Sequence, residues 1–128
     1  MRYFFSVAAV GLAVLASGCG QTQPTLAGGK PVSHWLQALQ DPDPKVRKTA
    51  VSKLGNVGTA DPAALPAVIG SLKDPDAGVR CAAILALVRS GPASEEAIPT
   101  LTEMQRNDRD AQVRSYAAQA LEKLQGGK

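Results

Sequence analysis

The sequence is poor in the residues that build most catalytic and metal sites. Its 128 residues include one histidine, His34, and two cysteines, Cys19 and Cys81. A zinc site needs three or four His, Cys or acidic ligands at suitable spacings, and none stands at such a spacing. A Ser–His–acid set and a glycine-rich phosphate loop are also missing. We therefore predict no metal, no cofactor and no catalytic site, and a solvent-facing or cap-adjacent His34.

Aromatic residues and net charge are also scarce. Aromatic residues make up 4% of the chain and apolar residues 45%, so a core must be built mainly of Ala, Leu and Val, which suits close helix packing. The formal net charge is +3. A nucleic-acid-binding domain is usually far more basic, so we expect no nucleic-acid partner.

The apolar run near the N-terminus is too short to span a bilayer. It extends over Phe4–Leu15, 12 residues, whereas a membrane-spanning helix needs about 20. Arg2 precedes the run and the small residues Ala16–Gly18 follow it. This arrangement is typical of a secretory signal peptide, and we expect residues 1–18 to be that signal.

The segment Leu15-Ala16-Ser17-Gly18-Cys19 resembles the lipobox of bacterial lipoproteins. The resemblance implies cleavage before Cys19, a lipid on that cysteine, and anchoring to a membrane. By the same resemblance, Gly20 in place of Asp implies the periplasmic side of the outer membrane in a Gram-negative bacterium. A plain signal peptide and an uncleaved anchor are the alternatives.

Two further expectations concern the residues after the signal. With Cys19 lipidated, Cys81 has no partner for an intramolecular disulfide, and we expect it to be a small filler on a helix. Residues 19–30 contain several glycines, one proline and no hydrophobic periodicity. They are predicted to form a flexible, lipidated linker before a domain at residues 31–126.

That domain contains one pattern three times. The copies are Asp41–Gly58, Asp74–Gly91 and Asp108–Gly126, and they begin 33 and then 34 residues apart. A period of this size indicates stacked supersecondary units. We expect units at about 31–58, 61–91 and 94–126, each made of two helices around an aspartate-rich turn, and Ser33 as the cap of the first helix.

Matching columns in the three copies identify the family that the domain resembles. They are Val-Arg pairs, alanines and leucines: Val46-Arg47, Val79-Arg80 and Val113-Arg114; Ala50, Ala83 and Ala117; Leu54, Leu87 and Leu121. Together with the turns, they resemble HEAT repeats, most closely the HEAT-like units of the phycobilisome-lyase type. The resemblance implies an all-α fold, a short α-solenoid of about three helical hairpins with the armadillo-type superhelix.

The resemblance also implies a structural role for the charged columns. Each arginine would reach a turn aspartate of a neighbouring unit and build a ladder from Arg47, Arg80 and Arg114 and from Asp41, Asp74 and Asp108. The turn acids are expected to cap the helices that follow them. The alternatives are an anionic ligand on the arginines or calcium on the acids.

A functional surface is expected where the second helices of the units line the concave face. The outward positions are mixed and mildly basic, and the predicted partner-binding face consists of Lys45, Lys48, Thr49, Ser52, Leu85, Arg89, Ser115, Tyr116 and Gln119. The same outward stripe also contains Asn56, Gly78, Cys81, Ala82, Gln112 and Lys123. This composition suits a protein or peptide partner better than a small-molecule substrate. Ordinary solvated surface is the alternative, and Trp35, large for an end helix, is a second possible docking edge.

Three functions are compatible with these features. We favour a membrane-anchored, non-enzymatic binding or scaffold module. The alternatives are an enzyme or enzyme accessory similar to the HEAT-like bilin lyases, and a purely structural subunit of a larger assembly.

Overall fold

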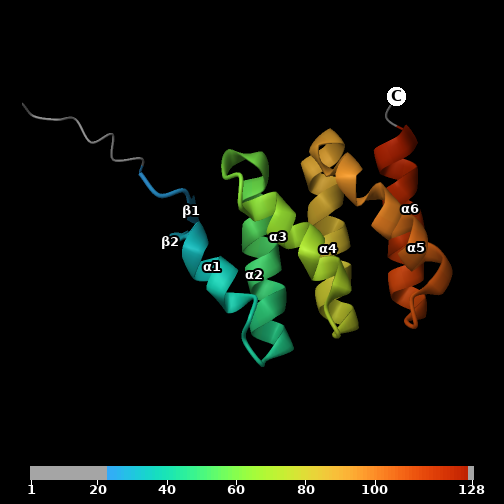
Figure 1. The fold of residues 1–128 in the computed structure, drawn as a ribbon, viewed down its shortest axis with the longest axis horizontal. Coiled ribbons are helices and arrows are strands. Elements are labelled where there is room, and N and C mark those ends of the chain that lie inside the picture. The colour runs from blue at the N-terminus through green and yellow to red at the C-terminus, as the bar shows by residue number, and fades with distance from the viewer. Residues whose placement is uncertain (1–22, 127–128) are drawn as a thin grey trace, which may run out of the picture.

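The computed structural model describes residues 23–126 and shows a row of helix pairs (Figure 1). The three pairs are α1 Val32–Ala38 with α2 Pro44–Val57, α3 Ala64–Gly70 with α4 Ala77–Ser90, and α5 Ile98–Asn107 with α6 Ala111–Gly126. Three 3₁₀ helices connect consecutive helices: η1 Gly58–Ala60 precedes α3, η2 Ser71–Lys73 lies between α3 and α4, and η3 Gly91–Ala97 precedes α5. The prediction of an all-α stack of helical hairpins is confirmed.

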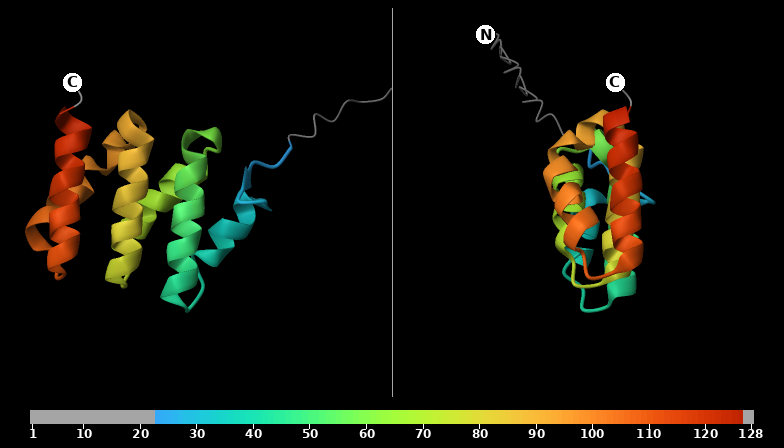
Figure 2. Two further views of the ribbon diagram at one scale, coloured as in Figure 1. Left: turned by 180° about the vertical axis from the view of Figure 1, so that it is seen from behind. Right: turned by 90° about the vertical axis from the view of Figure 1, so that its right-hand side faces the viewer.

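The helices lie in two layers. Figure 2 shows α2, α4 and α6 side by side in one layer, with α3 and α5 behind them. Each unit alone would leave its apolar side exposed, so the units bury that side against one another. In the middle of the stack, α4 is packed on both sides, by α2 and by α6.

The aspartate-rich turns start the second helix of each unit. The amide of Lys45 donates to Asp43 Oδ1 at 2.9 Å, and Pro44 occupies the first turn of α2. The corresponding carboxylates Asp76 and Asp110 accept from amides in the first turns of α4 and α6. These bonds satisfy amides that a helix start leaves free, so the expected capping role of the turn acids is observed.

The core follows the predicted columns. The alanine column and Leu54 and Leu87 are fully inaccessible to solvent, and Leu121 is buried at the last helix. The alanines allow close contact between the helices of a unit, and the leucines fill the space between units. The sequence period thus corresponds directly to the packing of the core.

Gly55 is the point of closest approach between α2 and α4. A methyl group added at Gly55 would lie 2.5 Å from Cβ of Ala86 and 3.4 Å from its Cα. Ala86 cannot swing away, because its Cβ is fixed to the backbone of α4. Glycine is therefore required at this position for packing between units.

We expect Gly55→Ala to destabilise the domain although alanine favours a helix. The gain in helix propensity is about 1 kcal/mol, and overpacking costs about 1–3 kcal/mol, so the net loss should be about 1 kcal/mol. Gly70→Ala is the matched control, because Gly70 has helical dihedrals and open space around it. It should stabilise the protein by about 0.5–1 kcal/mol. Urea unfolding of both variants checks the prediction; equal effects at both positions would contradict it.

The chain between Leu26 and Pro31 is ordered against α1, so the prediction of a flexible linker through Lys30 is wrong for this part. Strands β1 Leu26–Ala27 and β2 Lys30–Pro31 pair antiparallel. Gly28 and Gly29 turn the chain with φ of 57° and 79°, as a tight hairpin requires. The structured domain thus begins about five residues earlier than predicted. Residues 1–22, with the predicted signal and Cys19, lie outside the described part of the chain.

Trp35 explains why this hairpin forms. Its Nε1 donates to the carbonyl of Ala27 at 2.7 Å, and both residues are buried. A buried indole N–H needs an acceptor, which the hairpin supplies. The expectation that Trp35 marks a docking edge is therefore wrong, because β1 covers it.

The start of α1 also differs from expectation. The helix begins at Val32 after Pro31, and no side chain caps it, so the prediction that Ser33 is the cap is wrong. His34 is half-buried, edge-on to Trp35, with Nε2 3.3 Å from Nζ of Lys30.

No helix within residues 23–126 has the length and apolar character needed to cross a membrane.

Candidate functional site

The helices α2, α4 and α6 form one continuous surface, here called the α2–α4–α6 face. Most apolar residues of these helices are buried in the core, and most residues on their opposite side are exposed or half-buried. Positions i, i+3, i+4 and i+7 of a helix share a side, so the face is built from residues at this spacing in three parallel helices.

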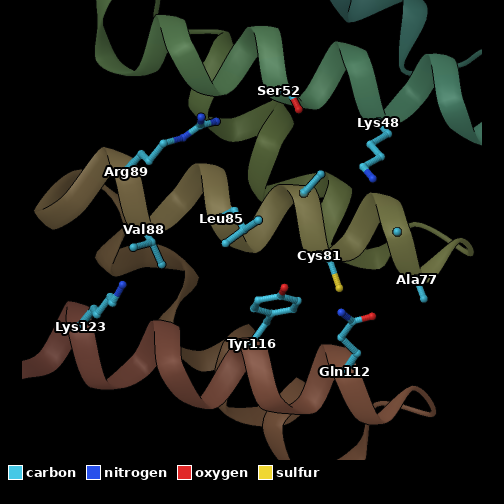
Figure 3. Close-up of a pocket in the computed structure, with 12 residues that line it drawn as sticks. Lys48, Ser52, Ala77, Cys81, Leu85, Val88, Arg89, Gln112, Tyr116 and Lys123 are labelled. Atoms are coloured by element: carbon cyan, nitrogen blue, oxygen red, sulfur yellow. The ribbon is translucent and has the colours of Figure 1, made fainter.

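A hollow of about 590 Å³ lies in the α2–α4–α6 face and is called the groove below. Figure 3 shows side chains from all three helices around it. Its lining comprises Lys48 and Ser52 of α2, Ala77, Gly78, Cys81, Ala82, Leu85, Val88 and Arg89 of α4, and Gln112, Tyr116 and Lys123 of α6.

The middle of the groove is apolar. Leu85 is 48% exposed, which is high for a large aliphatic side chain. Tyr116 faces it from α6 and packs with its ring partly buried against the core (Figure 3). An aliphatic side chain next to a tyrosine, with a polar rim around them, is typical of a surface that contacts another protein.

Five of the nine residues predicted for the partner-binding face line the groove: Lys48, Ser52, Leu85, Arg89 and Tyr116. The other four lie on α2 and α6 outside its lining. Among these, Thr49 Oγ1 donates to the carbonyl of Lys45 in its own helix, and Gln119 Nε2 lies 3.3 Å from Ser115 Oγ. The structure thus concentrates the predicted face around α4.

The groove also contains residues that the prediction did not include. They are Ala77 and Val88 of α4. Val88 stands three positions after Leu85, so helical spacing is the signal that finds it. It is half-buried, packs against the core and also reaches the groove.

The first rung of the expected ladder joins the first two units. Arg47 donates from Nε to Asp74 Oδ2 at 2.9 Å and from Nη2 to Asp74 Oδ1 at 3.1 Å. Its Nη1 donates to the carbonyls of Asp41 and Pro42 in its own turn. The hydrogen bond to Asp74 is the main cause that raises the pKa of Arg47. This planar fork ties one turn to the next.

The second rung joins the second and third units. Arg80 Nη2 donates to Asp108 Oδ1 at 2.9 Å, and Nη1 donates to the carbonyls of Asp74 and Pro75. Arg80 is only 5% exposed. Burial would raise the pKa of Asp108, but the Asp110 amide and the guanidinium of Arg80 outweigh it, so this pKa lies below its ordinary value.

The third rung of the predicted ladder does not form within residues 23–126. Arg114 donates to the carbonyl of Asp108 in its own turn, and the carboxylate of Asp41 accepts, among these residues, from the amide of Asp43 alone. These two residues belong to the first and the last of the three units within residues 23–126. The ladder arginines are engaged by the protein itself and are not part of the groove.

Cys81 lines the groove, and we expect it to react slowly. Burial, together with the charge of Asp110, raises the pKa of its thiol, although Arg80 opposes the shift. The reactive thiolate is therefore rarer at pH 7 than in an unfolded chain. Alkylation by iodoacetamide should be several times slower in the native chain than in urea, with Cys19→Ser present to isolate the site. Equal rates in both states would contradict this.

The described part of the chain has no cluster of three or more His, Cys, Asp or Glu side chains suited to a metal ion.

A known protein family matches most of this chain. The model of a family described as HEAT repeats matches residues 32–122, from the first residue of α1 into the last turns of α6. No curated protein matches the chain.

Proposed function

Because this chain belongs to the HEAT repeat family, we propose that it is a non-enzymatic binding module that holds a protein partner on the α2–α4–α6 face. Stacks of this kind generally mediate protein binding through the extended surface that their repeated helices create. The three units here offer such a surface at the smallest size at which a repeat stack is stable.

The observation that carries this proposal is the exposed Leu85 beside Tyr116 within the groove. Exposed apolar side chains that are scattered singly are common on any protein surface. Here the leucine sits in a hollow, next to a tyrosine and among residues of three helices, which favours a partner that covers it. Tyrosine is also enriched in the energetically important centres of interfaces.

Site-specific photocrosslinking in cells tests the proposal. A photoreactive residue at Gln112, which lines the groove, should give a discrete crosslinked partner that is lost with Leu85→Ser. The same residue at Gln105 of α5 is the matched control, because Gln105 is exposed on the other layer. Identical products at both positions would contradict a role for this face.

The proposal includes a membrane anchor at the N-terminus. It is supported by the lipobox-like segment Leu15–Cys19, and it places the module on the periplasmic side of the outer membrane if the host is Gram-negative. Labelled palmitate should be incorporated by the native chain and by Cys81→Ser, and lost with Cys19→Ser. Labelling that persists in Cys19→Ser would remove the anchor from the proposal and leave the binding face.

The two other candidate functions predict different results. An enzyme or accessory similar to the bilin lyases would carry a pigment or a metal after purification, which absorbance and metal analysis would detect. A purely structural subunit would give crosslinked partners that do not depend on Leu85.

A further inference from the structure

Positive charge is concentrated on the layer that contains the groove. The three helices of this layer, α2, α4 and α6, together contain eight basic residues, four in α2 and two each in α4 and α6. They contain a single acidic residue, Glu122. All other acidic residues of the chain lie in turns, in η3 or in α5. The net charge of the chain is only +3, but its basic and acidic residues are therefore concentrated in different parts of the fold.

Three of these cations are available at the groove. The salt bridges within residues 23–126 are those of Arg47 and Arg80. Lys48, Arg89 and Lys123 line the groove, and none of them forms an ion pair in the described part of the chain. No acidic side chain lines the groove.

The positions of the cations fit a ligand. Lys48 and Arg89 lie on the α2 side, and Lys123 lies on the α6 side, with Leu85 between them (Figure 3). Arg89 and Lys123 stand in the last turns of their helices, where a cation is favoured by the helix dipole. Lys48 stands near the start of α2, where the dipole does not favour it, so the dipole alone does not explain the set.

The acidic groups nearest to the groove are the helix caps. Asp76 and Asp110 stand at the starts of α4 and α6, and their Oδ1 atoms accept from backbone amides there. They lie at one end of the face, while Arg89 and Lys123 lie at the other. The end of the groove near Arg89 and Lys123 is therefore the part that most favours negative charge.

We propose that the groove binds an acidic protein segment, which sets an aliphatic side chain on Leu85 and carboxylates beside Lys48, Arg89 and Lys123. This inference rests on the proposed function and specifies the chemistry of its partner. The segment would run along α4, whose 14 residues span about 21 Å at 1.5 Å per residue. Electrostatic complementarity of this kind selects a partner and speeds its association.

A protein segment fits this site better than an anionic membrane surface. Leu85 and the three cations surround a hollow, and a flat bilayer would not reach its floor. A bilayer pressed on this face would also meet Glu122 and the two acidic caps. A chain segment can enter the groove and avoid them.

Fluorescence anisotropy with defined peptides tests the inference. The probe is a labelled helical peptide of about four turns, made of Glu, Leu and Ala, and its control has Gln in place of every Glu. The purified full chain should bind the acidic peptide at least about tenfold more tightly than the Gln peptide at low salt, and the difference should shrink with added salt.

Charge reversal at the groove provides the matched variants. Lys48→Glu/Lys123→Glu should reduce binding of the acidic peptide by about tenfold or more. Lys73→Glu/Arg106→Glu is the control, because it makes the same change in net charge at exposed positions in η2 and α5. It should leave binding nearly unchanged. Leu85→Ser should weaken binding of the acidic and the Gln peptides alike.

Other outcomes would overturn the inference. Equal binding of the Glu and Gln peptides is one such outcome, and an equal loss of peptide binding in the two charge-reversed variants is another. A third is that Lys48→Glu/Lys123→Glu leaves peptide binding intact but abolishes a preference of the chain for phosphatidylglycerol over phosphatidylcholine vesicles. If the crosslink at Gln112 survives Lys48→Glu/Lys123→Glu but not Leu85→Ser, the acidic partner is refuted and the proposed function stands.

Discussion

Leu87→Asp should leave the domain unfolded at room temperature. Leu87 is fully inaccessible and lies in α4, the helix packed between α2 and α6. A carboxylate buried there without a partner costs several kcal/mol, and the lost leucine packing adds about 2–5 kcal/mol. A domain of this size has only about 5–15 kcal/mol of stability in total. Far-UV circular dichroism should show loss of helix and of the cooperative melt.

The matched control for this variant is Leu85→Asp. It places the same side chain two residues earlier in the same helix, at a position that is 48% exposed. Because its carboxylate stays in water, the melt should remain cooperative, with a change of about 0.5 kcal/mol or less. If Leu87→Asp melted cooperatively with the same midpoint temperature as the native chain, the stacked arrangement around α4 would be refuted.

Asp108→Ala should be the second most damaging substitution. It removes the carboxylate that accepts a hydrogen bond from Arg80 Nη2, and the Arg80 side chain is almost wholly buried. Its Nε already lacks a hydrogen-bond partner within residues 23–126. The loss should lie between that of an exposed pair and that of a fully buried one, at about 2 kcal/mol. Asp108→Ala/Arg80→Met should recover part of it, as measured by urea unfolding.

Asp41→Ala is the control that distinguishes the contribution of the ion pair to stability from the contribution of the turn. Asp41 occupies the same turn position in the first unit and accepts from the amide of Asp43. Within residues 23–126 no arginine of another unit forms a hydrogen bond with it. Its replacement should cost about 1 kcal/mol or less. Equal losses for Asp41→Ala and Asp108→Ala would mean that the contact with Arg80 contributes nothing to stability.

The same pair gives the fold a dependence on pH. The pKa of Asp108 is lower in the folded chain than in the unfolded one. Its contribution to stability is therefore fully present above pH about 4 and is lost as the pH falls through the folded pKa. The difference in stability between the native chain and Asp108→Ala should shrink correspondingly below pH about 4. A constant difference down to pH about 2 would contradict this.

The repeat units could be predicted because their signals are local and occur three times. The columns of alanine and leucine define the core, and the aspartates and Pro44 define the turns. Two of the three ladder rungs could be anticipated by resemblance, since an arginine at the same place in each unit meets an aspartate one period later. Within residues 23–126, the side chains of Asp41 of the first unit and Arg114 of the last unit bind only their own turns.

The N-terminal hairpin was not predictable from the same reasoning. Each strand has two residues, too few to show an alternating pattern, and Gly28-Gly29 is equally common in linkers. It is held by later parts of the chain, because Trp35 Nε1 donates to the carbonyl of Ala27 and β1 packs against α2. The lining of the groove was predicted only in part, because the packing of α4 against α6 decides whether half-buried residues such as Val88 reach it.

The ladder has a consequence for how the chain can change in length. Arg47 and Arg80 each bind their own turn and the aspartate of the next unit, so a copy of the middle unit inserted after Gly91 would bring both halves of a rung with it. Arg80 would then meet the inserted aspartate, and the inserted arginine would meet Asp108. Duplication of a unit therefore preserves the rungs between neighbouring turns, so the ladder would continue through the lengthened stack.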